Sequence, residues 1–500
     1  MNTANSNYPM NNPFVIVAQA GSLLYRRLAV GRTSPVLYTS NNSVIRFMES
    51  RDLPNRMHIG TMNRGASVRI SDFGFLSDFG FFPRLLRQKI TALLLFLFAT
   101  HLALAATPRP TYNVRDYGAV GDGTNKDTIA LQKALDACAV SGGGDVIVPA
   151  GNYLIGSIQL GNATILRLQT NSVLIGTGDT NDYPLLDVRW EGRWEPGRRA
   201  LIYAANVDHT GITGPGRIEG NRAVAASQNP RGSVVLEPIS CNDVVWDGFT
   251  ITQGGNWATH PTYCTDVTIK NLTIIGNRDG IDVDSCKNVI IDHCNFDNGD
   301  DCISLKSGRG LNGARLGKAT ENVLISNCTM HGRRFAGVGI GSETSGGIRN
   351  IHIEHCQMTC RTYGIYIKTR LGRAGVIENI SANNLQILGG GFLKINLVSS
   401  GNTNTSDDPV PGDAGIPVGR NYSFSNISVT NCTRLVDAKD ILPQKPLAGF
   451  ILKNVTGQCS NAIVLANITG ARLKNIHVTG YQGALLTQTN VQGTGLESFK

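Results

Sequence analysis

The 500-residue chain contains 41% hydrophobic, 17% charged and only 7% aromatic residues, together with 57 glycines. This composition is typical of a long chain of turns and short strands, and it argues against a helical or a disordered protein. The formal net charge of +9 does not indicate a nucleic-acid partner, because the first 105 residues hold eleven Lys or Arg against four Asp or Glu and no basic patch with interleaved aromatics follows.

Residues 84–105 have the order of an export signal: a basic start, an apolar run and a small-residue end. Cleavage there predicts a secreted or periplasmic protein with no stable membrane association, and an uncleaved anchor is the alternative. Residues 1–83 are polar and without period, so we interpret them as a low-order leader from an upstream start, with Met62 a candidate for the true one. The functional domain is then 106–500.

The first element expected in this domain is a short amphipathic helix followed by a strand. Leu131, Leu135 and Cys138 fall on one helical face before a run of glycines. Thr124 and Asp127 have the spacing of a capping box, with Asp in place of Glu. We expect this helix to cover the end of a larger sheet structure.

One nine-residue phrase then recurs, in which an alternating apolar strand meets a polar Asn or His corner and a second strand. It begins at residues 243, 266, 288, 322, 350, 379 and 426. Such a repeat predicts an all-β solenoid whose coils stack through backbone hydrogen bonds and place like residues in columns. A propeller or a sandwich is the alternative, but neither explains one phrase that returns near every 23 residues.

The eleven cysteines all follow residue 105, and an odd number cannot pair completely within the chain. Cys294, Cys328 and Cys356 recur at one position of the repeat. We therefore expect them to form a buried column of apolar fillers and not disulfides. A solenoid of this kind needs no partner subunit, so we expect a monomer.

Three aspartates form the candidate catalytic cluster. Asp279 and Asp301 are 22 residues apart, one coil of the solenoid, and Asp300 lies beside the second of them. Like charges this close raise each other's pKa. Glycoside hydrolysis uses such a cluster, since one carboxyl must stay protonated to donate to the leaving oxygen while another stays ionised. The alternatives are a calcium site and, for Asp282, Asp284 and Asp297, ordinary turn residues.

The flanking residues decide among these interpretations. Three motifs in order resemble those of the polygalacturonase family of glycoside hydrolases: Asn277-Arg278-Asp279-Gly280, Gly299-Asp300-Asp301 and Tyr366-Ile367-Lys368. The resemblance covers roughly residues 111 to 400 and is greatest to bacterial-type members of the family. The resemblance implies a single-stranded right-handed parallel β-helix. It also implies hydrolysis of α-linked galacturonate in pectin, a polysaccharide substrate, and no cofactor or metal.

The resemblance also implies roles for individual residues. Asp300 is similar to the family's general acid, and Asp279 with Asp301 to the pair that activates water, with inversion at the anomeric carbon. Asn277 is expected to help hold the site, and Lys368 to bind the carboxylate of an acidic sugar. His260, in a Thr-His-Pro corner, is a candidate lining residue, although a corner histidine bound by backbone is equally expected.

Two positions depart from the family pattern. Phe335 stands where the family's histidine belongs, and Tyr366 replaces an arginine that commonly binds a galacturonate carboxylate. A rhamnogalacturonan or xylogalacturonan hydrolase, a β-helical pectate lyase and a non-catalytic carbohydrate-binding solenoid therefore stay open, as does the choice between endo and exo action. Further candidates for sugar contact are Arg333, Arg334, Arg370, Trp190, Trp194 and Trp257.

Overall fold

The computed structural model describes residues 109–401 and 408–497. The predicted leader 1–83 and signal segment 84–105 lie outside this range, and their assignment stays a prediction. Within the described residues, no helix is both long and apolar enough to cross a membrane.

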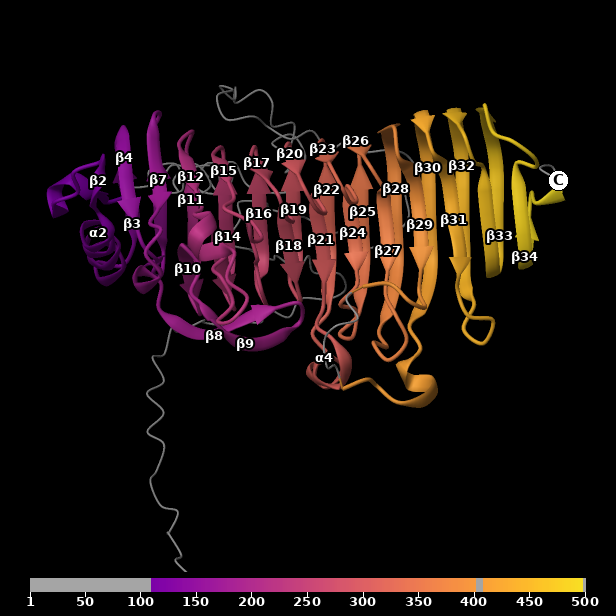
Figure 1. Ribbon diagram of the computed structural model, residues 1–500, viewed down its shortest axis with the longest axis horizontal. Helices are drawn as coiled ribbons and strands as arrows, with labels where there is room; N and C mark the ends of the chain where they lie inside the picture. The colour runs from indigo at the N-terminus through magenta and orange to yellow at the C-terminus, as the bar shows by residue number, and fades with distance from the viewer. Residues whose placement is uncertain (1–108, 402–407, 498–500) are drawn as a thin grey trace, which may run out of the picture. The chain divides into compact units, whose positions relative to one another are not determined.

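The chain is a right-handed parallel β-helix, and its N-terminal end is covered by one helix (Figure 1). The first elements are β1 (Thr111–Asn113), a 3₁₀ turn (Val114–Tyr117), β2 (Asp122–Lys126) and α2 (Thr128–Val140). Helix α2 buries the predicted face together with two alanines, the full set being Ala130, Leu131, Ala134, Leu135 and Cys138. The predicted amphipathic capping helix is confirmed.

The predicted capping box is wrong in its details. Asp127 is the N-cap residue of α2, but its side chain caps no helix N–H. The carboxylate instead accepts hydrogen bonds from the backbone N–H groups of Val120 (2.6 Å) and Gly121 (3.0 Å). Thr124 belongs to strand β2, before the helix. Asp127 therefore holds the preceding turn against the start of the helix.

Three parallel ladders run along the solenoid, and most coils contribute one strand to each ladder. The first ladder contains β3 (Gly144–Val148), β6 (Thr164–Leu168), β11 (Asp208–Thr213), β14 (Asn242–Asp247), β16 (Thr265–Lys270), β19 (Lys287–Asp292), β22 (Thr320–Ser326) and β25 (Ile348–Glu354). The second contains β4 (Gly151–Ile155), β7 (Ser172–Gly176), β12 (Arg217–Glu219), β15 (Thr250–Thr252), β17 (Thr273–Gly276), β20 (Asn295–Asn298), β23 (Thr329–Gly332) and β26 (Gln357–Cys360).

The third ladder positions the functional site. It begins with β5 (Ile158–Gln159), β10 (Ile202–Ala205) and β13 (Leu236–Ile239), and residue Thr259 bridges β13 to the next strand. It continues through β18 (Ile281–Asp284), β21 (Ile303–Lys306), β24 (Val338–Gly341), β27 (Tyr363–Lys368), β29 (Gly391–Asn396) and β31 (Arg434–Asp440).

Towards the C-terminus the strands lengthen and turn a corner of the coil without a break. These long strands are β28 (Val376–Leu388), β30 (Val418–Cys432), β32 (Leu447–Cys459), β33 (Ile463–Thr479) and β34 (Leu486–Thr494). An antiparallel hairpin of β8 (Leu185–Trp190) and β9 (Arg193–Arg198) and two short helices, α3 (Arg222–Ala225) and α4 (Gly310–Leu316), lie outside the three ladders. The hairpin and α4 extend from one side of the stack (Figure 1).

The repeated phrase marks successive coils, as predicted. Val244 pairs with Val267, Val267 with Val289, and Val289 with Val323. The phrase at 426 is out of phase, because Asn379 stands opposite Asn421 and Ser425 opposite Asn383. The last predicted coil therefore starts at Asn421.

A column of asparagines supports one corner of the coil. Asn322, Asn350, Asn379 and Asn421 adopt φ values of +55° to +60°, a left-handed conformation that asparagine tolerates better than most residues. Each side-chain amide donates to the amide oxygen of the preceding rung, at 2.9–3.0 Å. The polar corner of the repeat is therefore both a turn signal and a hydrogen-bonded ladder.

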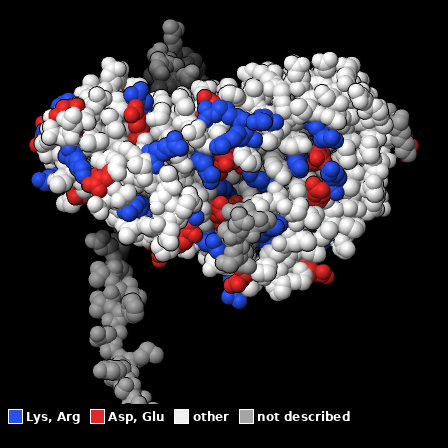
Figure 2. All heavy atoms as spheres, viewed as in Figure 1, with Lys and Arg blue, Asp and Glu red and all other residues white. Residues whose placement is uncertain are grey.

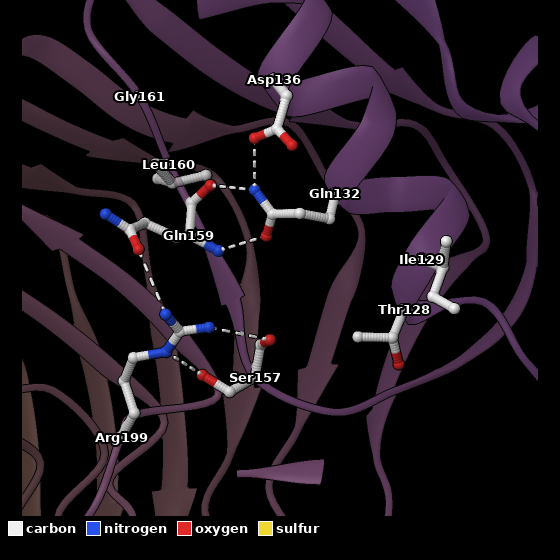
Figure 3. Close-up of a pocket in the computed structure, with 9 residues that line it drawn as sticks. All are labelled: Thr128, Ile129, Gln132, Asp136, Ser157, Gln159, Leu160, Gly161 and Arg199. Carbon is white, nitrogen blue, oxygen red and sulfur yellow. Dashed lines mark hydrogen bonds between the residues drawn. The ribbon is translucent and has the colours of Figure 1, made fainter. Parts of the chain in front are cut away.

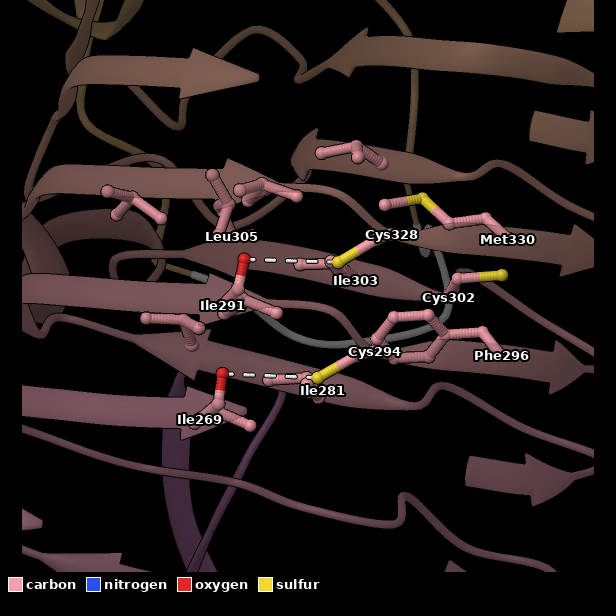
Figure 4. Close-up of a cluster of buried hydrophobic side chains, with 14 of the residues drawn as sticks. Ile269, Ile281, Ile291, Cys294, Phe296, Cys302, Ile303, Leu305, Cys328 and Met330 are labelled. Atoms are coloured by element: carbon pink, nitrogen blue, oxygen red, sulfur yellow. Dashed lines mark hydrogen bonds between the residues drawn. The ribbon is translucent and has the colours of Figure 1, made fainter. Parts of the chain in front are cut away.

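All eleven cysteines lie in the described part of the chain, and all are buried and free. Figure 4 shows Cys294 and Cys328 one above the other between isoleucines of adjacent coils. Their Sγ atoms lie 3.9 Å from the carbonyl oxygens of Ile269 and Ile291. The prediction of a buried column without disulfides is confirmed.

Candidate active site

A cavity of about 410 Å³ opens on the third ladder, and all three predicted carboxylates line it. Asp279 lies two residues before β18, and Asp300 and Asp301 lie three and two residues before β21. Ile281 pairs with Ile303, and the N–H of Gly280 donates to the carbonyl of Asp301 at 3.0 Å. The 22-residue spacing therefore does equal one coil. Figure 2 shows Lys and Arg side chains around a hollow in the middle of the visible face, with acidic side chains within it.

Asp301 is fixed by a cation and a backbone donor. The Lys368 ammonium lies 2.5 Å from Asp301 Oδ2, and the N–H of Ala336 donates to Oδ1 at 3.1 Å. Burial raises the pKa of Asp301, and the charge of Lys368 opposes that rise. Burial acts to lower the pKa of Lys368, but Asp301, Asp279 and Asp300 together outweigh burial and raise that pKa, so this ammonium keeps its proton.

Asp279 belongs to a second buried cluster, which contains Asp282, Lys306 and Glu343. The Lys306 ammonium lies 2.6 Å from Asp282 Oδ1 and 3.5 Å from Asp279 Oδ2, and 3.7 Å above the ring of Trp257. Side chains of Asp282 and Lys306 are 0% and 6% exposed. A buried ammonium surrounded by carboxylates is held by them and neutralises them.

The cluster shifts the pKa values of its acidic side chains in different directions. Burial opposes ionisation of Asp279, but Lys306, Asp282, Lys368 and Arg278 together outweigh burial and lower the pKa of that carboxyl. Burial and the neighbouring Asp279 raise the pKa of Asp282 well above its usual range. Burial likewise opposes ionisation of Glu343, yet Lys306 and Arg373 lower its pKa. Within this cluster the ionised form is therefore favoured at Asp279 and disfavoured at Asp282.

Asp300 has the opposite character to Asp279. Burial, then the charges of Asp279 and Asp301, raise the pKa of Asp300 to about 7. The cavity thus contains an ionised carboxylate and a carboxyl that is protonated near neutrality. That pair of states is what acid–base hydrolysis of a glycosidic bond requires.

The other two predicted site residues do not line the cavity. His260 is buried behind Trp257, with its Nδ1 3.2 Å from Glu237 and an edge-to-face contact at 5.0 Å to the Trp257 ring. Asn277 is exposed at the turn before Asp279, where its Oδ1 accepts from Arg333 at 3.1 Å. His260 therefore supports the cavity wall, and Asn277 supports the turn.

Among the described residues, no group of three or more His, Cys, Asp or Glu side chains has the arrangement of a metal site. A larger cavity of about 530 Å³ lies elsewhere, between α2 and β5 (Figure 3). Its polar side chains are bound to one another: Gln132 donates to Asp136 and to the Gln159 carbonyl, and Arg199 donates to Ser157. It has no cluster of carboxylates.

The model of the glycosyl hydrolases family 28 matches residues 138–390, half of the chain. The chain belongs to family 28 of the glycosyl hydrolases. It is 29% identical over 361 residues to a probable polygalacturonase of Vitis vinifera, covering 68% of this chain and 73% of that protein. It is 25% identical to an exo-poly-alpha-D-galacturonosidase of Dickeya chrysanthemi, covering 54% of each.

Solved structures agree with the fold of this hydrolase. It superposes on a family 28 exopolygalacturonase of Yersinia enterocolitica with a TM-score of 0.67 at 20% identity, covering 78% of both chains. An exopolygalacturonase of Thermotoga maritima gives a TM-score of 0.58 at 24% identity, covering 77% of this chain and 92% of that one. At these identities the superpositions establish the β-helix.

The two departures from the family pattern both lie in the cavity of the hydrolase. Phe335 is 43% exposed and Tyr366 is half-buried, and both are lining residues. The Tyr366 hydroxyl shares a hydrogen bond of 2.8 Å with Ser400. An aromatic ring and a phenol hydroxyl therefore line the cavity at the two positions where the resemblance leads us to expect a histidine and an arginine.

The remaining candidates for sugar contact divide into three groups. Trp257 lines the cavity, whereas Trp190 stacks on it at 3.9 Å and does not line this cavity. Arg333 and Arg334 donate to Asn277 and so brace the turn before Asp279. Within the described residues, Trp194 and Arg370 are not part of the cavity wall.

The sequence did not reveal the roles of Asp282, Lys306, Glu343 and Gly339. Gly339 pairs with Ser304 and Tyr366 on the third ladder. A Cβ atom built there lies 2.2 Å from Asp301 Oδ2 and 3.2 Å from Cε of Lys368. The absence of a side chain at this rung leaves the space that the Asp301–Lys368 pair occupies.

Gly339→Ala is expected to lower activity by at least about tenfold, because the added methyl group displaces a carboxylate held at the reaction centre. The rate of sugar release from polygalacturonate measures it. Gly178→Ala is the matched control, since its Cβ meets only Asn221 at an ordinary 3.6 Å. Equal rates for both variants would show that Asp301 has room to move without consequence.

Proposed function

We propose that this family 28 hydrolase cleaves α-linked galacturonate bonds of pectin with inversion, using Asp300 as general acid and Asp279 with Asp301 to activate water. The observation that carries the proposal is that the pKa values of two carboxyls in one cavity are shifted in opposite directions. The pKa of Asp300 rises to about 7, and that of Asp279 falls.

The residues of the cavity support each step. Protonated Asp300 donates its proton to the glycosidic oxygen, so the departing sugar leaves as a neutral alcohol. Ionised Asp279 accepts a proton from a water molecule that attacks the anomeric carbon from the other face of the ring. Asp301, fixed by Lys368 and the Ala336 N–H, holds that water on its second side.

The positive charges that line the cavity and the names of similar proteins favour an acidic substrate. Lys306, Lys368 and Arg278 line the cavity, and cations attract the carboxylates of a uronate chain. Several similar proteins are named polygalacturonases or exopolygalacturonases. A xylogalacturonan or rhamnogalacturonan backbone is the second candidate, because Tyr366 supplies a neutral hydroxyl where the family pattern has an arginine.

The activity is expected to fall as the pH rises through about 7. The acid Asp300 must be protonated, and it loses its proton through its raised pKa. On the acid side the activity is expected to fall as Asp279 and Asp301 take up protons; the pKa of Asp279 is lowered from its usual value, and that of Asp301 is raised. The pH dependence of kcat/KM measures both limits, since it reports groups of the free enzyme. A profile that stays flat from pH 5 to 9 would remove Asp300 from the role of acid.

Product analysis tests the reaction class and the substrate. Homogalacturonan, rhamnogalacturonan and xylogalacturonan are incubated side by side with the enzyme, and early products are followed by proton NMR. We expect saturated uronate oligomers that appear first as the β-anomer, with homogalacturonan cleaved fastest. An unsaturated, ultraviolet-absorbing product that disappears on chelation would identify a lyase instead.

We further propose that the enzyme is exported, by cleavage within 84–105, and acts as a monomer. N-terminal sequencing of protein collected outside the cytoplasm and its mass in solution test these two points. A mature protein that begins upstream of residue 84 would contradict the first.

A further inference from the structure

A second cavity adjoins the catalytic one. It has a volume of about 230 Å³, and its lining includes Trp190, Arg231 and Asn256. Glu191 and Arg278 line both cavities, so the two spaces meet at these side chains. A sugar chain that enters the catalytic cavity therefore has room for a neighbouring unit beside Arg278.

The cations around these cavities differ in what they already bind. Lys368 is paired with Asp301, and Lys306 with Asp282. Arg231 is paired with Glu195 at 2.8 Å. The backbone of Arg278 is bound, since its N–H donates to Gln253 and its carbonyl accepts from Asn298. Its guanidinium, by contrast, forms no hydrogen bond or ion pair with any described residue.

The position of this unpaired guanidinium is close to the chemistry. Arg278 immediately precedes Asp279, and its charge acts on Asp279 and on Asp300. Its backbone is fixed, while its side chain is only partly buried. Arginine presents donors in a planar fork that matches a carboxylate. This geometry therefore leaves the Arg278 guanidinium available to bind a carboxylate of the substrate.

We propose that Arg278 binds the carboxylate of the galacturonate unit that lies at the junction of the two cavities, and so sets the preference for an acidic unit next to the scissile bond. This inference rests on the proposed function. It assigns to Arg278 the binding of a carboxylate, which the Tyr366 hydroxyl, hydrogen-bonded to Ser400, does not provide.

The test compares binding of two ligands by calorimetry. Asp300→Asn protein, which binds without turnover, is titrated with a hexagalacturonate and with its methyl ester, with and without Arg278→Met. The acidic ligand is expected to bind about 10- to 100-fold more weakly to the double variant, as for loss of a charge-assisted hydrogen bond. The ester, which has no carboxylate to lose, is expected to change by less than about threefold.

Several controls make the outcomes distinct. Arg472 is exposed on β33 and is not part of either cavity, so Arg472→Met is the matched loss of one arginine. Arg278→Gln repeats the measurement with a polar side chain. Melting temperatures check folding. Equal loss for acid and ester would overturn the inference while the proposed function stands. Wild-type protein that neither binds nor cleaves galacturonate would overturn both.

Discussion

Asp300→Asn is expected to lower the rate of bond cleavage by about 10²- to 10⁴-fold, the range typical of a lost general acid. The amide keeps the size of the side chain but has no acidic proton for the leaving oxygen. Binding of oligogalacturonate is expected to be nearly unchanged or tighter, since the charge repulsion among three carboxylates decreases. Reducing-sugar release gives the rate, and calorimetry gives the affinity.

Asp297→Asn is the matched control for this variant. Asp297 lies three residues earlier on β20, where it pairs with His331 at 3.0 Å, and it does not line the cavity. Its substitution is expected to leave the rate within about twofold. A full rate for Asp300→Asn would exclude Asp300 as the acid and would leave a carbohydrate-binding solenoid as the better interpretation.

Lys306→Met is expected to destabilise the fold by about 3–5 kcal/mol, the usual effect of removing one partner from a buried ion pair. Methionine fills the volume, but it leaves Asp279, Asp282 and Glu343 without the central cation. Activity is also expected to disappear, because Asp279 then loses the charge that keeps it ionised at neutral pH. Urea denaturation measures the free energy of unfolding, and sugar release measures the activity.

Two further variants separate charge from packing. Lys287→Met removes an exposed ammonium that pairs with Glu321 at 3.2 Å, and exposed pairs contribute at most about 1 kcal/mol. Glu343→Gln in the Lys306→Met background removes one carboxylate that Lys306 keeps ionised, and it is expected to recover part of the stability. If Lys306→Met alone melts like the wild type, the ammonium is not what holds the buried acids together.

The coil and its carboxylates were predictable because both follow from a single period. Alternating residues such as Val244 and Val267 fix which face is buried, and 22 residues bring Asp279 beside Asp301. The predicted start of the last coil was wrong because two Asn-x-Ser units lie five residues apart there, at Asn421 and Asn426. Either unit satisfies the local pattern, and only the pairing with Asn379 distinguishes them.

The supporting groups were not predictable from the repeat. Lys306 occupies an outward position of β21, where a lysine on a solenoid is ordinarily exposed. It is buried because Trp257 and Glu343, which lie far from it in the sequence, cover it. The available signal was the placement of Asp282 and Asp284 one rung below Ser304 and Lys306. His260 was misjudged for the same reason, since Trp257 stands between it and the cavity.

The stacked architecture has a consequence for how the enzyme loses activity on heating. Each coil contacts only its two neighbours, so the terminal rungs have one interface and melt before interior ones. The cavity that contains the three carboxylates draws on β18, β21, β24 and β27, which lie well inside the array. Partial fraying that begins at β34 would therefore leave turnover intact, and spectroscopic unfolding would start at a lower temperature than inactivation.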